Sequence, residues 1–158
     1  MLKEMLGMAE GILQDLHNDH QEVSTMIETI LNTEDSKERG ALFKELMTNL
    51  LAHAHAEQNV LYKRMEKTDD EEGRKFALEG ANEHLLVETQ LQLLAKSRNK
   101  ATEQWTAQMT VLKELIEHHV DEEESTGFSR ARKEFSRDEL DKMAQQFQRQ
   151  KEKLIAGA

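Results

Sequence analysis

Apolar residues recur at alternating steps of three and four along four long stretches of this sequence. In the second stretch the series runs through Phe43, Leu46, Leu50, His53, Glu57 and Val60. Such steps place side chains on one face of a helix, and a helix bundle turns that face inward. Proline is absent, and Glu, Lys, Leu, Ala, Gln and Met dominate, which favours helix along nearly the whole chain. We therefore predict an all-α fold.

The breaks between these stretches are short. We expect long helices over about residues 9–31, 37–66, 68–96 and 102–124. The second and third of them follow the helix-start spacings Asp35-x-x-Glu38 and Thr68-x-x-Glu71. Helices joined by short connections lie antiparallel to one another, so the sequence predicts an up-down-up-down four-helix bundle.

The last part of the chain is expected to extend this bundle. Gly127 interrupts the apolar pattern and is expected to end the fourth helix. A short helical piece should follow over residues 128–134, and the capping box Ser136-x-x-Glu139 predicts an additional C-terminal helix on the outside of the bundle. We expect residues 1–158 to form a single domain, with the bundle over about 9–124 and a C-terminal extension over about 125–158.

Charge and composition exclude several classes of function. The formal net charge is −10 and no face is rich in Lys or Arg, so we expect no nucleic-acid partner. Acidic residues interrupt the N-terminus, and no apolar run approaches the ~20 residues of a membrane span, so we expect a cytoplasmic monomer or homodimer with no membrane contact. Cysteine is absent, which excludes disulfides and thiolate metal sites. Any chemistry must use histidines, carboxylates and hydroxyls.

Each predicted long helix places one histidine on its inward face, and three of them add a glutamate one turn later. The histidines are His20, His53, His84 and His119, and the glutamates are Glu57, Glu88 and Glu123. A lone histidine on an apolar face is more often an ordinary core residue, but here four helices share the feature. Unpaired buried charges are strongly destabilising, and no Lys or Arg lies in the middle of these faces. Because bound cations would remove this cost, we predict a metal site.

The number and kind of these side chains indicate which metal they hold. Six or seven N and O ligands are too many for one tetrahedral zinc ion and suit two octahedral ions with bridging carboxylates. Imidazole with carboxylate suits iron or manganese, whereas calcium takes oxygen ligands. No histidine has a glutamate three residues before it, which disfavours the carboxylate-type bundle proteins that carry Glu-x-x-His.

The order of these residues resembles the hemerythrin-like family over about residues 13–130. The resemblance lies in Asp19-His20, in His53-x3-Glu57 followed by Leu61-Tyr62, in Glu83-His84, and in His118-His119-x3-Glu123-Glu124 followed by Phe128. It implies a non-haem di-iron centre, with two iron ions bridged by oxo groups or carboxylates, that binds dioxygen or related small molecules. It further implies that His20, His53, His84 and His119 are terminal ligands and that Glu57 and Glu123 are bridges, with Glu124 as an alternative to Glu123.

The sequence departs from this family at Glu88. Hemerythrins proper have five histidines, and the fifth stands one turn after the residue that matches His84. If Glu88 binds iron instead, the centre is more anionic, which favours the ferric state and weakens reversible dioxygen carriage. We therefore expect binding of or reaction with dioxygen, peroxide or nitric oxide, in protection against oxidative or nitrosative stress. The alternative is iron storage or buffering without turnover, and the sequence leaves open whether the protein is a carrier, a sensor or an enzyme.

The other polar side chains near these motifs receive lesser roles. His17, His55 and His118 lie off the inward faces, and we expect His17 and His118 to hydrogen-bond to residues of the centre rather than to bind metal. Tyr62 is expected at an interface.

Overall fold

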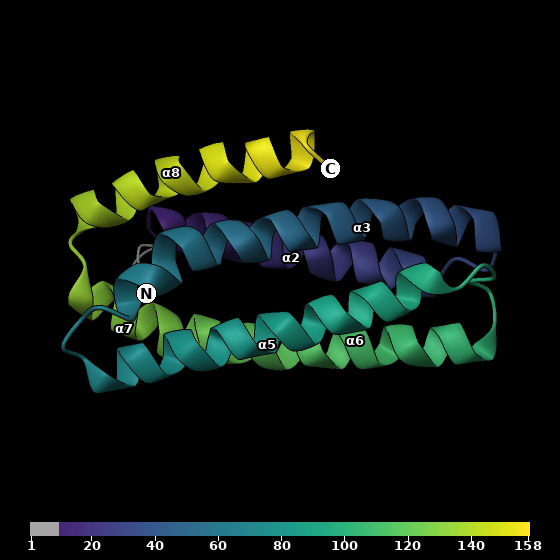
Figure 1. Ribbon diagram of the computed structural model, residues 1–158, viewed down its shortest axis with the longest axis horizontal. Helices are drawn as coiled ribbons and strands as arrows, with labels where there is room; N and C mark the ends of the chain where they lie inside the picture. The colour runs from purple at the N-terminus through teal and green to yellow at the C-terminus, as the bar shows by residue number, and fades with distance from the viewer. Residues whose placement is uncertain (1–9) are drawn as a thin grey trace, which may run out of the picture.

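The computed structural model describes residues 10–158, and every regular element in this range is helical, as predicted (Figure 1). The elements are α2 (Ile12–Leu31), α3 (Ser36–Glu57), η1 (Gln58–Tyr62), α4 (Lys63–Met65), α5 (Glu71–Lys96), α6 (Glu103–Glu122), η2 (Glu123–Gly127), α7 (Phe128–Glu134) and α8 (Arg137–Ala156). The two η segments are short π-helical turns that continue the helix before them. Residue 9, where the first helix is predicted to begin, lies outside the described residues.

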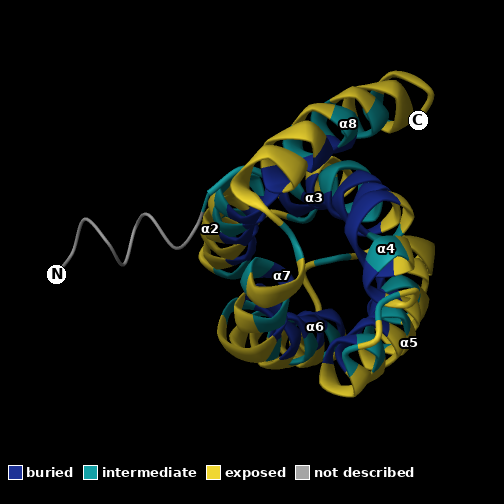
Figure 2. Cartoon of the chain, turned by 90° about the vertical axis from the view of Figure 1, so that its left-hand side faces the viewer, coloured by how far each residue is buried: buried dark blue, intermediate teal, exposed yellow. Residues whose placement is uncertain are grey.

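Four helices form the bundle. α2, α3, α5 and α6 lie lengthwise beside one another, and successive helices run in opposite directions (Figure 1). Seen end-on, they surround one interior, toward which their buried residues face (Figure 2). α8 packs outside these four, against α2 and α3. The predicted antiparallel bundle with an additional C-terminal helix is confirmed. Within residues 10–158, none of the helices is long and apolar enough to cross a membrane.

The predicted helix starts have different outcomes. The start over residues 35–38 is confirmed, and Ser136 and Glu139 form the expected capping box before α8. The start predicted at Thr68 is wrong, because the Thr68 hydroxyl donates back into the preceding turn and α5 begins only at Glu71.

The two helices that carry His-x3-Glu continue beyond it. After Glu57 and Glu123 the backbone makes a π-helical turn, in which N–H groups bond to carbonyls five residues earlier. The helix then resumes, so the prediction that Gly127 ends it is wrong. A Cβ at Gly127 would lie 2.5 Å from the ring of Phe76, so glycine serves close packing here rather than a helix end.

A buried polar layer divides the apolar core into two clusters. One cluster includes Ile12, Leu16, Val60, Tyr62, Phe76, Phe128 and Leu140, and the other includes Val23, Ile27, Phe43, Leu46, Leu91, Trp105 and Leu112. Apart from Arg39 near the start of α3, the buried polar residues of each long helix lie between the segments that supply the two clusters. The middle of the bundle is therefore polar, with apolar packing toward both ends.

Candidate metal centre

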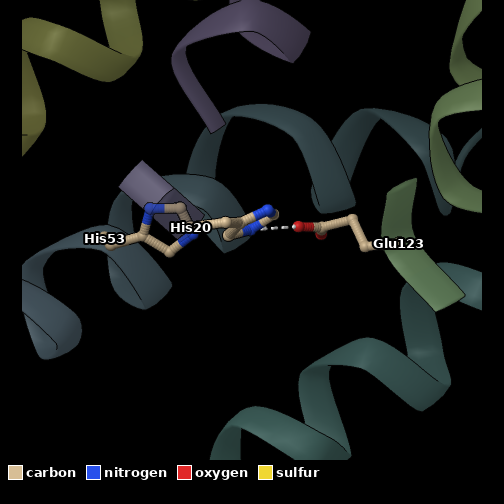
Figure 3. Close-up of side chains that lie close together, drawn as sticks. All are labelled: His20, His53 and Glu123. Atoms are coloured by element: carbon tan, nitrogen blue, oxygen red, sulfur yellow. Dashed lines mark ion pairs between the residues drawn. The ribbon is translucent and has the colours of Figure 1, made fainter. Parts of the chain in front are cut away.

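Six of the seven side chains that the sequence predicts as ligands meet in this polar middle. They are His20 of α2, His53 and Glu57 of α3, His84 of α5, His119 of α6 and Glu123 at the start of η2. Both glutamates are completely buried, and the histidines are only 5–8% exposed. The six form two groups, His20 with His53 and Glu123 (Figure 3), and Glu57 with His84 and His119. Within each group, one possible ligand atom per residue lies within 4.8 Å of the others.

The histidines direct their Nε2 atoms at the glutamates. Nε2 of His20 lies 3.0 Å from Oε1 of Glu123, the contact dashed in Figure 3. In the other group, Nε2 of His84 lies 3.2 Å from Oε1 of Glu57. Nε2 of His84 also lies 3.1 Å from Nε2 of His119. Two ring lone pairs at this distance repel each other unless a proton or a metal ion lies between them.

Each glutamate also approaches the other group. Oε1 of Glu57 lies 3.6 Å from Nε2 of His53. Oε2 of Glu123 lies 3.8 Å from Nε2 of His119. The two carboxylates therefore lie between the groups, where a bridging ligand belongs.

The opposite nitrogen of every ring, Nδ1, has an oxygen partner from a different helix. The partners are Asp19 for His53 (2.8 Å), the Gln58 side-chain carbonyl for His84 (2.8 Å), Glu83 for His119 (2.6 Å) and Glu124 for His20 (2.7 Å). Because these oxygens accept, each Nδ1 donates its hydrogen, which leaves the Nε2 lone pair of a neutral ring facing the interior. This is the usual arrangement of metal-binding histidines.

The interior contains acceptor atoms that the protein does not satisfy. Both carboxylate oxygens of Glu57, Oε1 of Glu123 and Nε2 of His20 are buried without a hydrogen-bond partner. Buried acceptors of this kind are strongly destabilising unless a cation binds them. Nitrogen and oxygen donors in two adjoining groups fit two divalent ions of the iron or manganese type.

The pKa shifts show how strongly this interior attracts positive charge. Burial alone would lower the pKa of His20, yet its contacts with Glu123 and Glu124 raise that pKa to about 10. Burial likewise opposes the shift at His53, but Asp19 and Glu57 raise the pKa of His53 to about 9. Without metal, these rings hold protons at neutral pH, and a metal ion would replace them.

Tyr62 belongs to the centre, so its predicted place at an interface is wrong. It is fully buried, its hydroxyl donates to Glu123, and the same oxygen lies 3.2 Å from Nε2 of His119. Its ring stacks on the imidazole of His84 with centroids 5.2 Å apart. A Cβ at Gly80 would lie 2.8 Å from the Tyr62 ring, so a glycine opposite makes room for it. The signal that could have found Tyr62 is the spacing of five residues from Glu57, which matches the π-helical turn.

Glu88 is not brought to the centre. Its side chain is 31% exposed and lies 3.1 Å from Nε2 of His55, itself on the surface. Val87 takes the inward position on this turn of α5. The predicted inward orientation of Glu88 is therefore wrong, because a helix allows either the third or the fourth residue after His84 to face the interior.

The remaining predicted residues lie around the centre. Glu124 stands behind His20 rather than in place of Glu123, and it also contacts Nδ1 of His17 at 3.0 Å. His118 is exposed and lies 3.5 Å from Glu83. His17 and His118 thus contact the carboxylates that support the centre.

Comparison with known proteins gives one family. A family model described as the hemerythrin HHE cation binding domain matches residues 11–131. The chain is 26% identical over 147 residues to a protein of Nostoc sp. named DNA nickase, covering 90% of this chain and 40% of that protein. It is 27% identical over 138 residues to an uncharacterised hemerythrin-like protein of Schizosaccharomyces pombe, covering 86% of this chain and 66% of that protein. The chain thus spans less than two thirds of the length of either relative. No solved structure matches it significantly.

Proposed function

The chain belongs to the hemerythrin HHE cation-binding domain family, and on this premise we propose that its interior holds two iron ions that bind or react with dioxygen, peroxide or nitric oxide. The observation that carries the proposal is the pair of buried three-residue groups, in which both oxygens of Glu57, one oxygen of Glu123 and Nε2 of His20 have no hydrogen-bond partner. Two groups side by side call for two ions rather than one.

We infer a role for each side chain from its contacts. His20, His53 and Glu123 would hold one ion, and Glu57, His84 and His119 the other. Glu57 and Glu123 would also bridge, because each approaches a histidine of the opposite group. When bound, the iron pair supplies open coordination positions and exchanges electrons with a small molecule. Tyr62 places an O–H beside Glu123 and holds that carboxylate in position.

The space beside the histidines limits what can bind. A cavity of about 30 Å³ adjoins all four rings, and its other walls are Val23, Leu50, Ala54, Val87, Ile116 and Val120. This is about the volume of one water molecule, and the apolar walls favour a small neutral molecule over an anion. A groove between α3 and α5 shares Leu50, Ala54, His84 and Val87 with the cavity. We infer that this groove is the route from the surface.

Metal analysis with spectroscopy tests the proposal. The purified protein should contain about two iron ions per chain and show a near-ultraviolet charge-transfer absorption under air that changes with peroxide. Changing His53 and His119 together to Ala should remove both. The matched control is His55→Ala, since His55 is a surface histidine that contacts neither group. Iron well below one per chain, with no further loss in the double variant, would refute the proposal.

Iron storage or buffering without turnover is the second candidate. A partly exposed group of Glu83, His118 and Glu122 adjoins the centre through Glu83, which contacts both His118 and His119. Such a group could pass ions between solvent and interior. Buffering predicts bound iron with no peroxide consumption, whereas a reactive centre predicts rapid peroxide loss.

The name of the relative called DNA nickase is not, by itself, evidence for that activity in this chain. The chain spans 40% of that protein and carries a formal charge of −10. We still predict that no nucleic acid binds, because a negatively charged protein repels the phosphate backbone. No observation tests this prediction. An electrophoretic mobility shift with duplex and nicked DNA at low salt measures it.

A further inference from the structure

α8 lies beyond residues 11–131, which match the family model, yet it reaches the metal centre. Its buried face consists of Leu140, Met143 and Phe147. The Phe147 ring meets the imidazole of His53 edge-on, with centroids 5.6 Å apart. A helix that the family domain does not include therefore forms part of the wall behind one ligand.

One turn after Phe147, α8 adds a charge. Nζ of Lys151 donates to both oxygens of Asp19, at 2.8 and 2.9 Å. Asp19 in turn accepts the Nδ1 hydrogen of His53 at 2.8 Å. An unbroken chain of hydrogen bonds thus joins the ammonium group of α8 to a ring whose Nε2 faces the interior.

Two other histidines also have a carboxylate at Nδ1, but these carboxylates have different second partners. Glu124, behind His20, also contacts His17. Glu83, behind His119, also contacts His118. Asp19 is paired instead with a lysine, Lys151, and both side chains are mostly buried, with 18% of Lys151 and 11% of Asp19 exposed. His53 is therefore the ring whose support depends on α8.

A carboxylate on the Nδ1 hydrogen makes the opposite nitrogen a stronger electron donor. An ammonium on that carboxylate withdraws charge from it and also fixes its position. We propose that Lys151 is a positioning residue for the metal centre. By holding Asp19 in place it fixes the orientation of the His53 ring, and by partly neutralising Asp19 it limits how much electron density His53 donates to its ion. The inference rests on the proposed function, since it assumes that metal binds at His53.

The test compares Lys151→Met with Lys153→Met, an exposed lysine on the same helix. Each full-length protein is loaded with Fe(II), and two quantities are measured: the rate of iron release to the ferrous chelator ferrozine, and the reduction potential in a redox titration. Lys151→Met should still bind two ions but release one of them about 10-fold faster, the usual effect of losing an outer hydrogen bond of this kind. Its potential should shift to lower values, because Asp19, no longer neutralised by Lys151, makes His53 a stronger electron donor.

Two further variants separate charge from packing. Lys151→Arg should restore both the release rate and the potential. In an Asp19→Asn background, the added change Lys151→Met should have no further effect on the potential, since the lysine acts through that carboxylate.

The outcomes are distinct. If Lys151→Met matches Lys153→Met in both measurements, or releases iron faster with an unchanged potential, Lys151 has at most a structural role and the inference is wrong. If the wild-type protein binds no iron, the proposed function and this inference fail together. Iron in the wild type with equal behaviour of the two lysine variants removes only the inference.

Discussion

Exchanging Glu57 for glutamine, with the same exchange at Glu88 as the control, tests the ligand set most directly. Both glutamates stand four residues after a histidine in the sequence. Only Glu57 is completely buried, with both oxygens lacking a hydrogen-bond partner, whereas Glu88 is partly exposed and paired with His55. The sequence treats the two alike, so a difference between the variants can come only from their places in the fold.

The expected magnitude follows from linkage between metal binding and folding. An ion present at 100 times its Kd stabilises the folded state by about 2.7 kcal/mol, so two ions contribute about 5 kcal/mol. The unfolding entropy of a chain of 158 residues is about 0.3 kcal/mol per degree, so loading should raise Tm by about 16 °C. Glu57 approaches both groups, and we expect Glu57→Gln to lose more than half of this increase. Losing a surface ion pair at Glu88 costs about 0–1 kcal/mol, with or without metal.

The assay is thermal unfolding of each variant with Fe(II) and again with excess chelator, together with metal content. Taking the difference within each variant cancels any effect of the substitution on the metal-free fold. A Glu57→Gln protein that keeps the full metal-dependent increase, or a Glu88→Gln protein that loses it, would show that the centre is not built as described.

Three further predictions concern the same interior. Tyr62→Phe should destabilise the chelator-treated protein by about 1–3 kcal/mol in urea, because a buried carboxylate loses its donor, while metal content stays unchanged. Gly127→Ala should destabilise by about 1–3 kcal/mol in the same assay, whereas Gly40→Ala, where a Cβ meets nothing, should stabilise by about 0.5–1 kcal/mol. Because folding raises the pKa of His53 to about 9 and that of His20 to about 10, protonation of these rings stabilises the metal-free fold. This stabilisation is complete below pH 6.5 and is lost as the pH rises through 9 and 10. The Tm of chelator-treated protein should therefore fall over that range.

The helices and most of the candidate site residues could be predicted from sequence, for a physical reason. Steps of three and four decide which side chains share a helix face, and an apolar face must be buried. A histidine or glutamate on such a face is therefore carried into the interior with its neighbours, as His53 and Glu57 are. The same rule is ambiguous by one position on α5, where Val87 and Glu88 both lie within one turn of His84. The apolar residue took the inward place there because exposing valine and burying a charge are both unfavourable.

Tyr62 could not be placed by counting α-helical turns. Five residues after Glu57, an α-helix would carry a side chain about 140° around its axis, away from the interior. The π-helical turn of η1 inserts an extra residue into the turn and brings Tyr62 back to the inward face. Glu123 and Phe128 stand in the same relation across η2, and Phe128 is buried as well. The spacing of five in both motifs is the only local sign of this irregularity.

The residues that accept the Nδ1 hydrogens of the four histidines could not be predicted, because each of them binds a histidine on a different helix from its own. Asp19 directly precedes His20 in the sequence, but adjacent residues lie about 100° apart around a helix, so Asp19 reaches the boundary with α3 and supports His53. The same relation repeats from η1 to α5, from α5 to α6 and from η2 back to α2, so the hydrogen bonds run all the way around the bundle. Rotating one helix would therefore displace its own histidine and also the hydrogen-bond partner of a histidine on the neighbouring helix. The pattern along one helix shows which of its side chains face inward. It does not show which residue of a neighbouring helix each histidine contacts, because that depends on how the helices pack. Lys151 of α8 adds one further hydrogen bond to Asp19. Among the four histidines, His53 is therefore the one whose partner is itself held by α8.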